Sequence, residues 1–250
     1  MTTTPEPSPS DHVPDYPVML NVAGRRCLVV GGGSVAARRA QGLLAAGARV
    51  TVVAPDVVAA IDQLATRSPA GETGPPGPTE ASTINTSHRA GTLEMVRRHY
   101  QVGEAGHYDM VVTATGAPEV DRAVVSDAIS AGVLVNSADR GSPGTVLLPA
   151  VHRDGPVTVA VSTGGASPAL ARWLRDRFAS SIPPAVATLA ALLEEARSDM
   201  RSAGRPTESV DWVAALDEQV VPLVEAGRID EARAALRGLC VPLSDAPGPE

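Results

Sequence analysis

Short apolar runs and longer periodic segments take turns along the first 140 residues of the chain. The runs are rich in valine and continuously apolar, which is typical of strands buried on both faces. They span residues 26 to 30, 49 to 55, 110 to 115 and 133 to 138. The segments 34 to 47 and 118 to 132 have the helical period, and each ends on a glycine. This alternation predicts an α/β fold with a doubly wound parallel sheet.

The pattern changes after residue 143. Residues 145 to 163 predict a β-hairpin joined through Asp154 and Gly155, a favourable turn pair. A helix over 167 to 178 is expected to begin with a serine N-cap followed by proline. The segment from 183 to 238 has a helical pattern throughout. A hairpin followed by helices at the end of such a fold is often an oligomerisation module.

Composition divides the chain further. Two segments rich in Pro, Ser and Thr are expected to be disordered, namely a tail over 1 to 15 and a surface insertion over 67 to 91. The remaining chain divides into a nucleotide-binding domain at 16 to 143, a hairpin region at 144 to 180 and a helical domain at 181 to 250.

Charge and composition exclude several functions. No lysine is present, which excludes a Schiff-base lysine and the lysine-bearing phosphate loop. The net charge is −7, so a nucleic-acid partner is not expected. No apolar run is long enough for a membrane span, and the start lacks the pattern of a signal peptide, so we expect a cytoplasmic protein. Two cysteines, Cys27 and Cys240, are interpreted as packing residues. The five histidines lack metal-ligand spacing, so no permanent metal site is predicted.

The first strand runs directly into the glycines of GGGSVA. Gly31 allows the turn out of the strand, Gly33 lets the backbone approach a diphosphate, and Ala36 occupies the position where helix and strand touch. A helix that starts at Ser34 and Val35 would direct its N–H groups at an anion. Glycine turns are common, but this one lies between a strand and a helix of a βαβ unit, and it therefore predicts a dinucleotide site.

The acidic partner of the ribose fits less well. It is expected at the end of the second strand, where the chain offers Pro55 and Asp56, two residues beyond the usual position. Asp56 either reaches the ribose or caps the next helix. No arginine follows that would bind a 2′-phosphate, so NAD is favoured over NADP.

Three stretches together resemble a known family: YPVMLNVAGRRCLVVGGGSVAARRA, VNSAD and VSTGGASPALAR. They are similar to the precorrin-2 dehydrogenases, including the N-terminal part of sirohaem synthase. The resemblance implies a Rossmann domain, a dimerisation region at 144 to 180, a helical domain and a homodimer. It also implies NAD-dependent oxidation of precorrin-2 to sirohydrochlorin, and some members insert ferrous iron as well.

The resemblance also suggests site residues. Asp139, at the end of N-x-x-D, matches the family's key catalytic aspartate. A carboxylate beyond a strand end could accept protons. The same residue could instead only stabilise a turn. The stretch with Ser162, Thr163 and Gly164 matches the segment beside the active site. Arginines could pair with substrate carboxylates or be solvated on the surface. The candidates are Arg140, Arg153 and Arg172.

One departure concerns the cofactor. Relatives often carry T-D-D after the fourth strand, where this chain has Thr115, Gly116 and Ala117. Whether Thr115 contacts the cofactor as expected therefore stays open. Two hypotheses follow: an NAD-dependent precorrin-2 dehydrogenase, or a catalytically inactive NAD-binding sensor or assembly module with the same fold.

Overall fold

A computed structural model describes residues 15–67, 91–139 and 144–239. The chain forms two compact units, Met1–Leu148 and Pro149–Glu250. The expected disordered tail and insertion lie, apart from their end residues, outside the described ranges.

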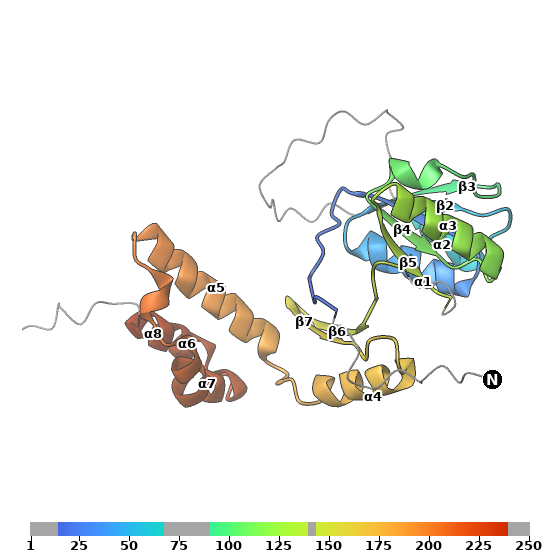
Figure 1. The fold of residues 1–250 in the computed structure, drawn as a ribbon. Coiled ribbons are helices and arrows are strands. Elements are labelled where there is room, and N and C mark those ends of the chain that lie inside the picture. Colours follow the sequence, from blue (N-terminus) through green and yellow to red (C-terminus); the bar gives the residue numbers. More distant parts are fainter. Residues whose placement is uncertain (1–14, 68–90, 140–143, 240–250) are drawn as a thin grey trace, which may run out of the picture. The chain divides into compact units, whose positions relative to one another are not determined.

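Unit 1 contains a sheet flanked by helices (Figure 1). The sheet has five strands in the order β3-β2-β1-β4-β5. All four neighbouring pairs are parallel, which confirms the doubly wound fold. The strands are β1 (Arg26–Val30), β2 (Arg49–Val53), β3 (Thr92–Val96), β4 (Met110–Thr113) and β5 (Leu134–Ser137). The order reverses between β1 and β4, because the chain leaves β1 toward β2 and leaves β4 toward β5.

Helices cover both faces of this sheet and bury a separate core on each. The first core joins α1 (Ser34–Ala45) and α2 (Ala59–Arg67) to alternate residues of the strands, among them Cys27 and Val112. The second joins α3 (Pro118–Ser130) and the short η2 (Glu104–His107) to the other alternate residues. Cys27 is fully buried, and burial raises the pKa of its thiol to about 11, as suits a packing residue.

Two strands end two residues earlier than the sequence predicts. β2 ends at Val53 rather than at residue 55, where Pro55 has no N–H to donate to the ladder. β4 ends at Thr113 rather than at 115, because the hydroxyl of Thr115 accepts a hydrogen bond from Ala117 N (3.1 Å) and closes a local turn.

The expected hairpin is shorter than 145 to 163. Its strands are β6 (Ala150–Asp154) and β7 (Val157–Val161), paired antiparallel. The residues before β6 lie along β5 instead: Val146 N donates to Val135 O (2.9 Å), and Val135 N donates to the hydroxyl of Thr145 (3.0 Å). The hairpin itself is confirmed, but its start was predicted too early, because one part of the apolar run bonds to β5 and the next part forms the hairpin.

Unit 2 continues with α4 (Pro168–Ala179), whose N-cap Ser167 accepts a hydrogen bond from Leu170 N as predicted. The helices that follow pack around a third core that includes Leu192 and Leu236. They are α5 (Val186–Ser202), η3 (Thr207–Ser209), α6 (Trp212–Ala215), η4 (Leu216–Val220), α7 (Val221–Glu225) and α8 (Ile229–Leu239). Among the described residues, no helix is both long and apolar enough to cross a bilayer.

Candidate functional site

The candidate site lies at the carboxyl ends of β1, β4 and β5. In a doubly wound sheet a crevice opens where the strand order reverses, and here that point is between β1 and β4. Three predicted groups lie at this edge: the glycine turn after β1, Thr115 after β4, and Asp139 after β5. The parallel register brings these separate parts of the chain to one edge.

Gly31 and Gly32 are required by the packing of the turn itself. Gly31 has a φ of +125°, and a Cβ added there would overlap the carbonyl oxygen of Ala114, the residue after β4. A Cβ on Gly32 would overlap the carbonyl oxygen of Asp56. The role of Gly32 was not predicted from the sequence, because its neighbour Asp56 is 24 residues away in the chain.

Gly33 differs from these two residues. It is exposed, its φ is −82°, and a Cβ added there would meet nothing within 4 Å. It is the N-cap of α1, and the helix has neither a side-chain cap nor an acidic residue in its first turn. The first helical hydrogen bond is donated by Ala37 N to Gly33 O (3.0 Å). The amides of Ser34 and Val35 therefore remain available for an anion.

These features fit a dinucleotide. Ala36 is fully buried against the sheet, so the helix lies close to β1, as the spacing predicted. The open space at Gly33 and the uncapped amides suit a pyrophosphate, because the phosphate oxygens would supply the missing acceptors. The contacts of individual residues with the cofactor remain predictions.

Pro55 and Asp56 follow β2 and are exposed. In the described part of the chain no hydrogen bond links the Asp56 carboxylate to α2, which begins at Ala59. Val58 N donates instead to Gly32 O (2.8 Å). The structure thus gives no support to the capping alternative, and the contact of Asp56 with a ribose stays a prediction.

Thr115 lies in a turn held by a carboxylate that the sequence analysis did not select. Asp121, in the first turn of α3, is 2% exposed. Its Oδ1 accepts hydrogen bonds from the hydroxyl of Thr115 (2.8 Å), the amide of Thr115 (3.2 Å) and the hydroxyl of Thr113. The signal that could have found it is its position in the first turn of the helix that follows β4.

Asp139 lies two residues beyond β5 and is half-buried. Ala138 N donates to Thr113 O (2.9 Å), which holds this segment beside the end of β4. The amide of Asp139 donates to the Ser137 hydroxyl (3.2 Å). Arg140 lies outside the described residues.

The first residue of the N-x-x-D stretch has a structural contact. Asn136 is 4% exposed, and its Nδ2 donates to Val146 O (2.8 Å). This bond fastens the segment before the hairpin to β5. Its role therefore differs from that proposed for Asp139, although the two residues share a motif.

The remaining predicted residues belong to unit 2. Thr163 Oγ1 accepts from Ser167 N (3.0 Å), and Gly164 N donates to the Ser162 hydroxyl (3.2 Å), so this turn leads directly into α4. Arg153 and Arg172 are exposed. Roles for these residues in substrate binding stay predictions.

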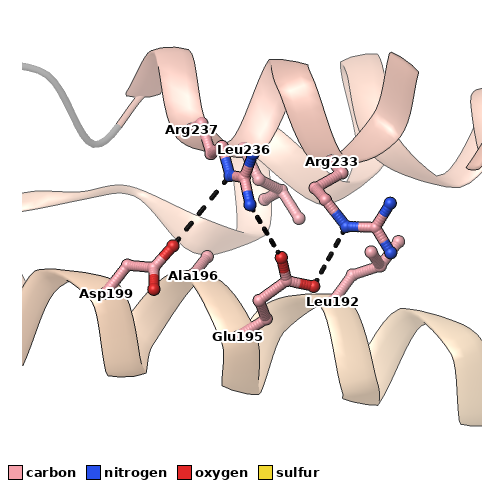
Figure 2. A pocket seen from close by; sticks show the side chains of 7 residues that line it. All are labelled: Leu192, Glu195, Ala196, Asp199, Arg233, Leu236 and Arg237. Atoms are coloured by element: carbon pink, nitrogen blue, oxygen red, sulfur yellow. Dashed lines mark hydrogen bonds and ion pairs between the residues drawn. The ribbon is translucent and has the colours of Figure 1, made fainter. Parts of the chain in front are cut away.

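Two other features of the described chain do not extend the candidate site. Within 15–67, 91–139 and 144–239, no three His, Cys, Asp or Glu residues are grouped closely enough to hold a metal ion. Figure 2 shows the contact between α5 and α8, where Glu195 lies between Arg233 (3.0 Å) and Arg237 (3.1 Å). Because these charges pair with one another, they serve the contact between the helices.

Comparisons with known proteins agree with this arrangement. Residues 18–150 match the family described as putative NAD(P)-binding, and residues 154–181 match the one described as sirohaem biosynthesis protein central. Among solved structures, SirC, a precorrin-2 dehydrogenase, is similar with a TM-score of 0.64 and 26% identity, covering 90% of this chain and 98% of that one.

Curated relatives are longer than this chain. Siroheme synthase 1 of Halorhodospira halophila is 37% identical over 240 residues, which cover 94% of this chain and 45% of that protein. The siroheme synthase of Nitrosomonas eutropha is 34% identical over 220 residues, covering 87% and 42%. The chain thus spans less than half the length of these relatives.

Proposed function

The chain belongs to the family of precorrin-2 dehydrogenases and sirohaem synthases, and from that membership we propose that it oxidises precorrin-2 to sirohydrochlorin with NAD. The observation that carries the proposal is the reversal of the strand order between β1 and β4, with the open, uncapped N-terminus of α1 following β1. Family membership supplies the substrate class.

Each part of the crevice has a separate task. The amides at the start of α1, next to Gly33, hold the pyrophosphate, and Asp56 accepts hydrogen bonds from the ribose hydroxyls. Bound NAD supplies an acceptor for a hydride. Ser34, Val35, Pro55 and Thr115 line the same site.

Asp139 takes the proton. Oxidation of precorrin-2 removes a hydride and a proton, and only the hydride has an acceptor in the nicotinamide. A carboxylate at the end of β5, beside the end of β4, is placed to accept the proton as a general base. Ser162, Thr163, Gly164 and Arg140 are proposed to bind the carboxylates of the tetrapyrrole.

Anaerobic incubation with precorrin-2 and NAD tests the proposal. We expect reduced nicotinamide to appear together with sirohydrochlorin. Asp139→Asn should lower kcat about a hundredfold or more, because the amide cannot accept the proton, while NAD binding is retained. A folded wild-type chain that binds NAD and reduces none in the presence of precorrin-2 would contradict the activity.

Three further proposals depend on family membership. Ferrous iron is a second substrate, inserted into sirohydrochlorin while Asp139 accepts pyrrole protons. Loss of anaerobic sirohaem formation in Asp139→Asn tests this proposal.

The chain acts as a homodimer in the cytoplasm. Large apolar side chains exposed on α4, which include Leu170 and Trp173, support the dimer. The alternative of an inactive NAD-binding module gains no support from the relatives.

A further inference from the structure

The turn between β4 and α3 is fixed by a buried carboxylate that the proposed chemistry does not use. The Oδ1 atom of Asp121 accepts hydrogen bonds from both Thr113 and Thr115. Side chains of a helix lean toward its N-terminus, so a residue in the first turn reaches back to the preceding strand end. Asp121 thus ties α3 to the end of β4.

The turn held in this way lies beside the glycine turn, at the point where the strand order reverses. Gly116 has a φ of +75°, and the Thr115 hydroxyl accepts a hydrogen bond from Ala117 N (3.1 Å). A Cβ added to Gly31 would overlap Ala114 O and lie 3.1 Å from Thr115 N. The glycine turn and the β4–α3 turn are therefore in direct contact, and a shift of one would displace the other.

A carboxylate is suited to this position because every group that faces its Oδ1 is a donor. The donors are two hydroxyls and one amide, and an ionised carboxylate only accepts. Thr113 is fully buried, so removal of the acceptor would leave its hydroxyl without that partner in a dry environment. The backbone of the β4–α3 turn would then shift as these donors form hydrogen bonds with other acceptors.

We infer that Asp121 is a positioning residue of the cofactor site. By holding the hydroxyl and the amide of Thr115, it fixes the β4–α3 turn as the wall against which NAD binds beside the glycine turn. The inference rests on the proposed function, because it concerns the same crevice.

A matched control is present on the same helix. Asp127 accepts hydrogen bonds from the Tyr100 hydroxyl and from Gly103 N (2.8 Å). It lies six residues further along α3, about 9 Å along the helix axis, and faces η2 rather than the crevice. Its loss removes a comparable network from the same helix without touching the β4–α3 turn.

The experiment measures the Kd for NAD by calorimetry and the midpoint of thermal unfolding for the full chain and three variants. Asp121→Ala should raise the Kd about tenfold or more, since the turn loses its acceptor. Asp121→Asn keeps an oxygen acceptor and should recover most of the affinity. Asp127→Ala should lower the unfolding midpoint and leave the Kd within about twofold of wild type.

The outcomes separate the two proposals. Unchanged NAD affinity in Asp121→Ala, or an equal loss of affinity in Asp127→Ala, would overturn the role of Asp121. If Asp121→Ala fails to fold, Thr113→Val removes one buried donor; it should raise the Kd severalfold, and wild-type affinity there would equally overturn the inference. A wild-type chain that binds no NAD contradicts the proposed function itself, and the role of Asp121 with it.

Discussion

The three consecutive glycines after β1 look alike in the sequence but are required for different reasons. Gly31 combines a left-handed φ with a close approach to Ala114, and Gly32 contacts the backbone of Asp56. Gly33 has ordinary dihedral angles and open space around it. The first two are required by the fold, whereas the third is free for a ligand.

This difference predicts opposite results for two alanine substitutions. Gly31→Ala should lower the free energy of unfolding by about 2–4 kcal/mol, because the added methyl is both strained and overlapping. Gly33→Ala should lower the free energy of unfolding by no more than about 1 kcal/mol, the cost of alanine at an N-cap. It should raise the Kd for NAD about tenfold, since its methyl occupies the space predicted for the pyrophosphate.

Urea unfolding and NAD titration of both variants check this prediction. Gly33→Ala serves as the stability control for Gly31→Ala, because both add the same methyl group. Wild-type affinity for NAD in Gly33→Ala would show that the space is not a cofactor site, and a loss of stability as large as that of Gly31→Ala would show that the space is not open.

At the scale of elements, α5 and α8 illustrate which contacts hold two helices together. Leu192 and Leu236 are buried between them, while the ion pairs of Glu195 lie at the rim (Figure 2). The hydrogen bond from Arg233 lowers the pKa of Glu195, but the carboxylate remains solvated. Exposed pairs contribute little, so the apolar contact should dominate.

Leu236→Ala should therefore lower the stability of unit 2 by about 2–4 kcal/mol, whereas Glu195→Gln should have a much smaller effect. Tryptophan fluorescence during urea unfolding measures this, because Trp173 and Trp212 both lie in unit 2. Val213→Ala, a truncation at a side chain that is 69% exposed, is the control. An equal loss in Glu195→Gln would mean that the ion pairs carry the contact.

At the scale of the whole molecule, each unit has its own core. The two cores of the parallel sheet lie in unit 1, and the helical core lies in unit 2. The exposed apolar side chains of α4 belong to unit 2 and include Leu170 (46%), Trp173 (58%) and Phe178 (50%). Such a set on one helix suits an interface.

The proposed homodimer predicts that Leu170→Ser/Trp173→Ser shifts the chain from twice 25.6 kDa to the monomer mass. Both side chains are exposed in the single chain, so the fold should be preserved. Light scattering coupled to gel filtration measures the mass, with Val213→Ser as the control. A wild-type mass of 25.6 kDa at micromolar concentration would exclude the homodimer.

The alternating part of the fold could be predicted from the sequence because its signals are local. Continuous valine runs, helical periods and glycine stops predicted the strands and helices on both sides of the crevice. Neither β3 nor α2 was predicted, because both border the long polar segment at 67 to 91, which interrupts the alternating pattern. The hairpin start was misplaced, because an apolar run does not reveal which sheet it joins.

By itself the sequence determined the doubly wound architecture, the glycine turn and the family, since these depend on residue order and spacing. Only the tertiary structure decided which glycines are required by packing, that Asn136 fastens a neighbouring segment, and that Asp121 holds the turn beside the crevice. The physical reason is that hydrogen bonds and close approaches depend on distance in space. Parallel strand register brings together groups that lie far apart in the chain.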